Sequence, residues 1–203
     1  MGTAAQVSVM CFSRVGYYLT YGSKSLTLDE YRKEFEKSSN RSVSMPIAGT
    51  IVWGLIALLS TQFDETIALY ILLFATGGIF LLALVIAKIR TENLVSSSNP
   101  FAKLMGLCIL MVNLLWAVHI PLLLNAPEFV PLSLGVGLGL HWVVYSWIVK
   151  HPLGLIHAIL RSLLIVLAWY LFPNDRLLAI SSVIVLAYLT TIFQMLTREI
   201  QRT

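Results

Sequence analysis

The sequence predicts an all-α integral membrane protein, a bundle of six transmembrane helices preceded by a short N-terminal amphipathic helix. Hydrophobic residues make up 58% of the 203 residues and charged residues only 12%, whereas about a quarter of the residues in a soluble domain are charged. The apolar residues gather in segments close to the ~20 residues that a helix needs to cross ~30 Å of hydrocarbon. Because lipid offers no partner to a free backbone group, these segments must be helical.

The composition along the chain divides it into three parts. Residues 1–25 mix small, polar and aromatic residues without a long apolar run, and we expect a flexible N-terminal arm there. Residues 26–42 are rich in charges and form the predicted cytoplasmic amphipathic helix. Residues 43–203 contain the long apolar segments and form the predicted transmembrane domain.

The amphipathic helix is predicted from its start signal and its spacing. Thr27 and Glu30 stand three residues apart, in the pattern of a capping box. Leu28, Tyr31 and Phe35 follow at helical spacing with charges between them. Such a helix can lie on the membrane surface or lead, solvated, into the first span, and both alternatives stay open.

The transmembrane segments are separated by short polar connections, so consecutive helices must be antiparallel neighbours. The six predicted spans cover residues 43–60, 66–87, 101–124, 129–149, 152–172 and 177–196.

The charges of the connections predict the orientation in the membrane. Cytoplasmic loops carry an excess of Lys and Arg. One side of the six-span arrangement has only Arg176 among several acids, and the other side has Arg32, Lys33, Lys37, Arg41, Lys88, Arg90, Lys103, Lys150, Arg198 and Arg202. We therefore expect a multi-pass membrane protein with both termini in the cytoplasm.

Four polar residues in the fourth and fifth segments form the main candidate site. His141, Tyr145, His157 and Arg161 flank the short turn at residues 150–151, and at ~1.5 Å per residue their depths match within about one turn. Ionisable groups at membrane depth are costly and mark functional sites by default. The sequence therefore predicts one polar pocket in the cytoplasmic half that binds a small anion or a lipid headgroup.

No carboxylate lies within any predicted span, so Arg161 lacks an acidic partner by sequence. The alternative to a bound anion is an arginine whose long side chain reaches the cytoplasmic interface. Asn113, in the middle of the third segment, is a secondary ligand-binding candidate, although membrane Asn usually bonds a neighbouring helix. His119, beside Pro121 near the outer end of that segment, is expected to lie apart from this group.

Gly135 and Gly139 form a GxxxG pattern, which lets two helix backbones approach closely. We expect these glycines to serve helix packing, and they offer a route to a homo-oligomer.

Several classes of function lack support in the residues. There is no basic stripe with interleaved aromatics for nucleic acid, and Cys11 and Cys108 have no disulfide or zinc spacing. Two histidines at matched depth could in principle ligate haem, but buried histidines more often bond a neighbour. We therefore expect no catalytic residues, no metal and no cofactor.

Two short motifs resemble a known family. Asn99-Pro100-Phe101-Ala102-Lys103-Leu104 is similar to an Asn-Pro-x-x-Lys-Leu motif, and the run of residues 141–147 to a His-x-x-Pro-Tyr-Ser-Trp motif with Val144 in place of the proline. Both belong to a small prokaryotic multi-spanning membrane family catalogued only as a domain of unknown function. The resemblance covers residue 26 to the C-terminus and implies an inner-membrane protein of bacterial type. It marks Asn99, Lys103, His141, Tyr145 and Trp147 as the positions to test.

Three functions remain after these exclusions. The first is binding or transport of a small anionic or lipid-like ligand through the polar pocket. The second is a structural or regulatory role as a membrane partner protein without chemistry of its own. The third is an enzyme acting on a lipid, for which His141, Tyr145 and His157 are the only acid–base candidates.

Overall fold

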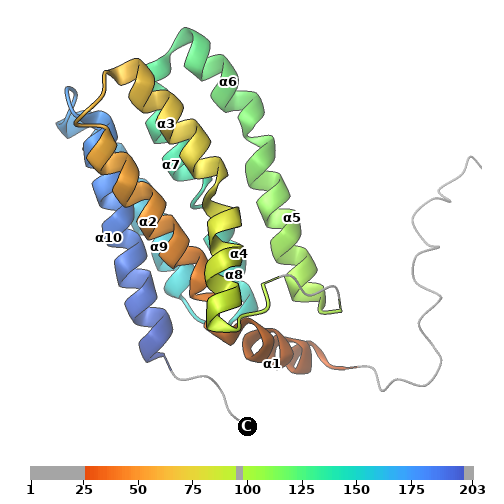
Figure 1. Ribbon diagram of the computed structural model, residues 1–203. Helices are drawn as coiled ribbons and strands as arrows, with labels where there is room; N and C mark the ends of the chain where they lie inside the picture. The colour runs from red at the N-terminus through yellow and green to blue at the C-terminus, as the bar shows by residue number, and fades with distance from the viewer. Residues whose placement is uncertain (1–25, 95–97, 199–203) are drawn as a thin grey trace, which may run out of the picture.

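The computed structural model describes residues 26–94 and 98–198, and these form a bundle of helices with one helix across its end (Figure 1). The helices are α1 (Leu28–Ser39), α2 (Ser44–Leu59), α3 (Glu65–Gly77), α4 (Ile79–Arg90), α5 (Pro100–Leu114), α6 (Trp116–Asn125), α7 (Val130–Gly137), α8 (His141–Ile148), α9 (Leu153–Leu171) and α10 (Arg176–Thr197), with 3-10 turns η1 (Asn40–Ser42) and η2 (Pro127–Phe129).

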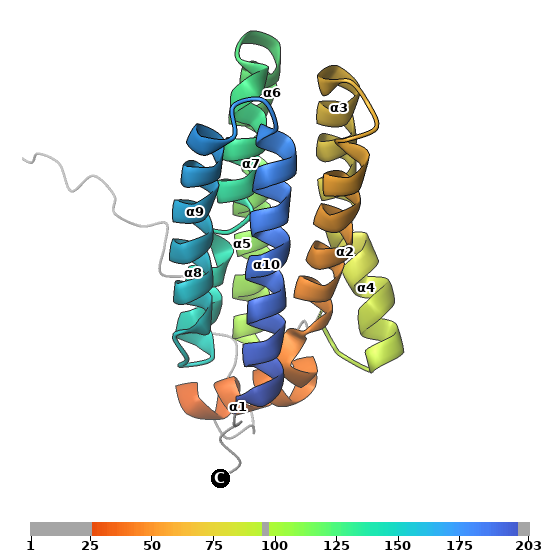
Figure 2. The same cartoon turned by 90° about the vertical axis from the view of Figure 1, so that its left-hand side faces the viewer.

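The centre of the bundle is α10, which packs along α2 on one side and α9 on the other (Figure 2). Around these three, α4 packs on α2, α7 and α8 pack on α9, and α5 packs on α8. Trp53, Ile165 and Ile184 form the core between them and are fully buried. The α5–α6 segment lies at the edge, with only 11% of its most apolar window buried inside the protein.

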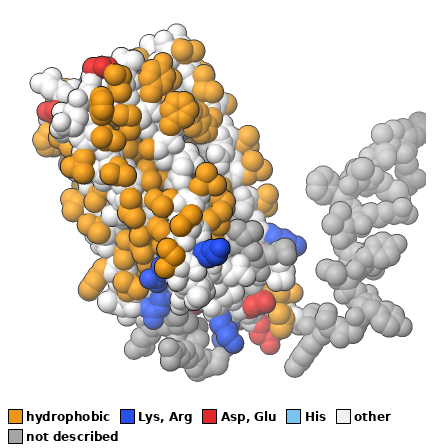
Figure 3. Space-filling view, in the orientation of Figure 1, with side chains coloured by type: hydrophobic (Ala, Val, Ile, Leu, Met, Phe, Trp, Pro, Cys, Tyr) orange, Lys and Arg blue, Asp and Glu red, His pale blue; other side chains and the backbone are white. Residues whose placement is uncertain are grey.

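The helices coincide with the predicted spans, and the structure supports a membrane protein. Five helical segments are long and apolar enough to cross a membrane, or six if the bent pair α3–α4 is counted as one span. Apolar side chains cover the face of the bundle that Figure 3 shows, and basic side chains lie toward the end near α1. This is the distribution that a hydrocarbon surround requires.

One of the predicted spans is sharply bent, and two others contain a short 3-10-like turn within an otherwise continuous span. We call these three points the helix breaks, and the apolar periodicity did not predict them. The second bends by 43° between α3 and α4 at Gly78, where two consecutive glycines weaken the helix. The third is interrupted at Leu115, between α5 and α6. The fourth is interrupted at residues 138–140, between α7 and α8, in a run of three glycines that disfavour helix. At Val144, α8 continues without a break.

The end helix α1 starts where the capping box is, with Thr27 and Glu30 bonding each other's backbone. Polar contacts hold it under the bundle. The Arg32 Nε donates to the Ile148 carbonyl at 3.1 Å, at the end of α8, and its guanidinium lies 4.8 Å from the Trp147 ring centroid. Asp29 accepts from Lys150 and from Arg32, and these two cations lower the pKa of its carboxyl.

The chain turns from α1 into α2 through residues of unusual conformation. Asn40, Arg41 and Ser42 have φ of 42°, 71° and 55°, a region that costs non-glycine residues free energy. Arg41 is held on both sides: its Nη1 donates to the Met195 carbonyl at 2.9 Å and also to that of Leu196, and its own carbonyl accepts from Tyr145. The predicted flexible arm, residues 1–25, lies outside the described residues.

Candidate functional site

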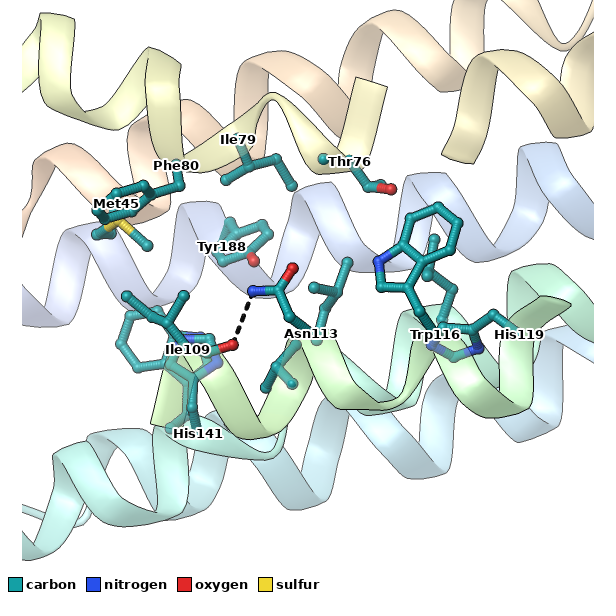
Figure 4. A pocket seen from close by; sticks show the side chains of 15 residues that line it. Met45, Thr76, Ile79, Phe80, Ile109, Asn113, Trp116, His119, His141 and Tyr188 are labelled. Atoms are coloured by element: carbon teal, nitrogen blue, oxygen red, sulfur yellow. Dashed lines mark hydrogen bonds between the residues drawn. The ribbon is translucent and has the colours of Figure 1, made fainter. Parts of the chain in front are cut away.

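The three helix breaks converge on one cavity of ≈ 100 Å³. Its wall includes residues beside each break: Gly77 and Ile79 from the second span, Asn113 and Trp116 from the third, and Leu138 from the fourth. Figure 4 shows that the side chains labelled around it come from several different helices. Discontinuous helices that meet in the middle of a bundle are typical of ligand sites in membrane proteins.

A second cavity of ≈ 60 Å³ continues the first toward α1. The two share Met45, Phe80, Ile109, His141 and Trp142. We call the combined space the α4–α5 groove, since Phe80 of α4 and Ile109 of α5 line both parts.

The end of the α4–α5 groove nearest α1 is lined in part by α1 itself. Phe35 and Ser39 of α1 line the second cavity, together with Asn93 of the loop that follows α4. The backbone N–H of Asn93 donates to the Ser38 carbonyl at 2.9 Å, which holds this loop against α1. The groove therefore runs from beneath α1 to the level of the helix breaks.

His141 and Tyr145 lie along the groove, as two of the predicted site residues. His141 lines both cavities, and its ring centroid is 5.7 Å from that of Trp142. The Tyr145 ring lines the part near α1, but its hydroxyl donates to the Arg41 carbonyl at 3.1 Å. Tyr145 therefore contributes ring surface to the groove, and its polar atom fixes the turn between α1 and α2.

His157 and Arg161 lie together behind the groove wall. The Arg161 Nη1 and the His157 Nε2 are 3.4 Å apart, and both residues are buried. The His157 ring is 4.6 Å from Trp142 and 5.2 Å from Tyr188, and these two rings line the groove. Neither His157 nor Arg161 lines either cavity.

The pocket predicted for His141, Tyr145, His157 and Arg161 is thus divided in two. The side chains of Trp142 and Tyr188 form an aromatic layer between the two parts, which the sequence did not predict. Arg161 has 0% exposure, so the alternative of an arginine that reaches the interface does not hold.

Asn113 lines the inner cavity, and its amide donates to the Ile109 carbonyl of its own helix at 2.8 Å. His119, expected to lie apart, is on the wall of the same cavity as His141 and bonds Ser133 at 3.1 Å. Asn113, His119 and His141 therefore line one cavity, although the sequence predicted that His119 would lie apart.

The two glycines of the GxxxG pattern pack inside the chain. A Cβ on Gly135 would lie 3.1 Å from Ile165, and one on Gly139 would lie 3.3 Å from the Arg161 Cδ. The close approach they allow is between helices of one chain, so a contact between copies would need another surface. The homo-oligomer stays a prediction.

The α4–α5 groove is an apolar surface with a few polar groups, the composition typical of small-molecule sites. Within residues 26–94 and 98–198, no group of three or more His, Cys, Asp or Glu is placed to hold a metal ion. The groove's chemistry, as the described side chains provide it, is hydrogen bonding from Asn113, His119, His141 and Tyr188.

The sequence model of the family of unknown function DUF7010 matches residues 28–198. The chain belongs to this family. The prediction that the chain belongs to a family of unknown function is confirmed. No curated protein and no solved structure matches the chain.

The DUF7010 match begins at the first residue of α1 and ends immediately after α10. The end helix is therefore part of the family's domain together with the bundle, and residues 1–25 lie outside the match, as expected.

The motif positions in this DUF7010 member have structural contacts that explain them without a ligand. Asn99 caps α5 by accepting from the Phe101 N–H at 2.9 Å and donates to the Tyr31 carbonyl and to Glu34 of α1. Trp147 lies beside Arg32 of α1. Of the positions marked by the resemblance, only His141 and Tyr145 also line the groove.

Proposed function

We propose that this DUF7010 member is a multi-pass protein of the inner membrane that binds an anionic, lipid-like ligand in the α4–α5 groove. The observation that carries the proposal is one groove, lined by residues beside the bend in the second span and the turns in the third and fourth, which reaches from α1 to the level of these helix breaks.

The apolar wall favours a hydrocarbon chain as the part of the ligand inside the groove. Met45, Phe80, Met105 and Ile109 supply much of this wall. The α5 side belongs to the span that is buried least, with 11% of its window inside the protein. A lipid can therefore reach the groove sideways from the bilayer, without crossing polar surface.

Charge favours an anionic ligand. Lys88 and Lys103 are exposed at the ends of α4 and α5 nearest α1, and neither forms an ion pair with a described carboxylate. Arg161 adds a buried positive charge behind Trp142 and Tyr188. Cations at this level attract lipid phosphates, so the groove would place a chain inside and a headgroup at its basic rim.

Filling the groove tests this proposal. Ile109→Trp puts a larger ring into both cavities, and we expect retention of added phosphatidylglycerol to fall about tenfold because the chain loses its place. Native mass spectrometry of the purified protein measures this, with phosphatidylcholine at equal concentration to test the preference for anionic lipid.

The matched control is Leu110→Trp, one residue along α5 on a face that is 54% exposed. It adds the same ring toward lipid and should retain phosphatidylglycerol as the wild-type protein does. Equal retention by Ile109→Trp, or no retention by the wild-type protein, would count against the groove as a lipid site.

The orientation that this function needs is six spans, with α3 and α4 counted as one, and both termini in the cytoplasm. Its support is the basic end near α1. In a background with Cys11→Ser and Cys108→Ser, Lys150→Cys should resist an impermeant thiol reagent in intact cells, and Asn125→Cys should react. The reverse pattern would invert the orientation and move the basic rim to the outside.

A structural role as a partner subunit is the second candidate function. The exposed α5–α6 span favours it, because so little of its surface is used within the chain. The native mass spectra separate the two: a second protein that remains bound while no lipid is retained supports the partner role.

A further inference from the structure

Arg161 is the centre of a buried cluster in which hydrogen-bond donors outnumber acceptors. Its Nε and Nη2 have no hydrogen-bond partner among the described residues, and the same holds for the indole N–H groups of Trp53 and Trp142. Trp53 and Arg161 are both 0% exposed, and Trp142 is 4% exposed. Buried donors without acceptors are costly and uncommon in native proteins, and each requires an explanation.

Aromatic rings from two different helices lie near this guanidinium, and a third ring contacts the neighbouring His157. Its Cζ is 5.1 Å from the ring centroid of Tyr188 on α10 and 6.0 Å from that of Trp53 on α2. Trp142 of α8 stacks on His157, which lies one turn before Arg161 on α9. Ring faces attract a cation, but they offer no acceptor lone pair to the N–H groups.

His157 uses only one of the arginine nitrogens. Arg161 can only donate, so the His157 Nε2 must accept from Nη1. The hydrogen of His157 is then on Nδ1, which donates to the Thr191 hydroxyl at 2.7 Å, and that hydroxyl donates to the Ala187 carbonyl at 2.8 Å. This chain of donors ends at the backbone and leaves Nε and Nη2 unsatisfied.

The Arg161 Nε lies next to the break between α7 and α8. A Cβ on Gly139 would be 3.4 Å from Nε, so the glycine lets the backbone at this break approach the guanidinium closely. Among the described residues no carboxylate pairs with Arg161. A single positive charge with two unsatisfied donors thus stands beside a helix break in the apolar interior, and an uncompensated ion there is strongly disfavoured.

We propose that Arg161 binds a small monoanion, of the size of chloride, held by its Nε and Nη2 with the indole N–H groups of Trp53 and Trp142 as further donors. A monoanion balances the one uncompensated charge, which a water molecule would not do. Arg161 is 0% exposed and lines neither cavity, so the anion it binds must be small. The proposal is independent of lipid binding in the α4–α5 groove, since Arg161 does not line it.

The test is the chloride dependence of the melting temperature of the purified full-length protein in a neutral detergent. Sodium gluconate replaces sodium chloride at constant ionic strength, which removes general screening from the comparison. A ligand that binds only the folded state raises the melting temperature, and at 100 times the dissociation constant we expect a rise of about 5–10 °C for a chain of this size.

Three variants assign the effect to the site. Arg161→Leu should abolish the chloride dependence, Arg161→Lys should weaken chloride binding at least about tenfold because the planar fork is lost, and Trp53→Phe should weaken it while keeping the ring. If Arg161→Leu does not fold, the chloride responses of Arg161→Lys and Trp53→Phe provide the test. Arg176→Leu is the matched control: this arginine lies 4.2 Å from the Trp169 ring at the other end of the bundle, and its loss should leave the chloride response unchanged.

The anion site is overturned if chloride does not change the melting temperature of the wild-type protein. It is also overturned if Arg161→Leu, or both Arg161→Lys and Trp53→Phe, respond to chloride as the wild-type protein does. A buried water would then be the partner of Arg161. The groove-filling variant Ile109→Trp separates this result from the lipid proposal, because it should lose phosphatidylglycerol and keep its response to chloride.

Discussion

Gly154→Ala is expected to destabilise the protein by about 1–3 kcal/mol, because it forces overpacking at the tightest helix contact. Gly154 lies in the first turn of α9, directly against α8. A Cβ there would collide with the Trp142 carbonyl oxygen and lie 3.0 Å from the Ser146 nitrogen. These are backbone atoms that cannot move aside as a side chain can, so the α8–α9 hairpin would have to open.

The measurement is the melting temperature in detergent, where a loss of this size corresponds to a decrease of several degrees. Gly106→Ala is the control, since a Cβ at that position of α5 meets nothing within 4 Å. It should be neutral or stabilising by about 0.5–1 kcal/mol, the usual gain from replacing a helical glycine. If the two variants melted together, the close approach of α8 and α9 would be disproved.

Asn99→Ala is expected to cost about 2–3 kcal/mol and to release α1 from the bundle. Asn99 is 1% exposed, and its side chain makes three hydrogen bonds. Alanine removes the cap of α5, typically worth ~1 kcal/mol, and leaves the buried Phe101 N–H without its acceptor. It also breaks the two hydrogen bonds that join the start of α5 to Tyr31 and Glu34 of α1.

Hydrogen exchange identifies where this loss occurs. Amide exchange should accelerate in residues 28–39 of α1, while the central part of α10 keeps its protection. Asn125→Ala is the matched control, because the Asn125 amide is exposed and bonds only the Pro121 carbonyl of its own helix in the described structure. We expect its free energy of unfolding to change by no more than about 0.5 kcal/mol. Uniform acceleration along the whole chain in Asn99→Ala would show a general loss of stability instead of a released α1.

Local features of the sequence were sufficient to predict where the long helical segments lie, although not the breaks within them. The segment predicted at residues 177–196 became α10 (Arg176–Thr197), and the capping box at Thr27 starts α1. Helix formation and membrane insertion depend on neighbours within a few turns, so a pattern of apolar residues and caps is enough. Membership of a family of unknown function was also predicted and is confirmed.

The glycines at 135, 137 and 139 show where local information was ambiguous. Their spacing predicted helix packing, and Gly135 does pack against Ile165. The same residues also end α7 and separate it from α8. A glycine permits both close packing and a break in the helix, and only the surrounding helices determine which occurs at each position.

The arrangement of the candidate site was decided by the tertiary structure. Residues that meet are far apart in the chain: Arg32 bonds the Ile148 carbonyl, and Tyr145 bonds that of Arg41. The layer of Trp142 and Tyr188 between groove and arginine did not follow from the sequence, and the matching depth of His141 and Arg161 stays a prediction. Depth along a helix depends on residue number alone, whereas the direction of a side chain depends on which neighbours fill the space around it. Helix positions are therefore properties of the sequence in its membrane, and the division into an apolar groove and a buried cationic cluster is a property of how the helices pack.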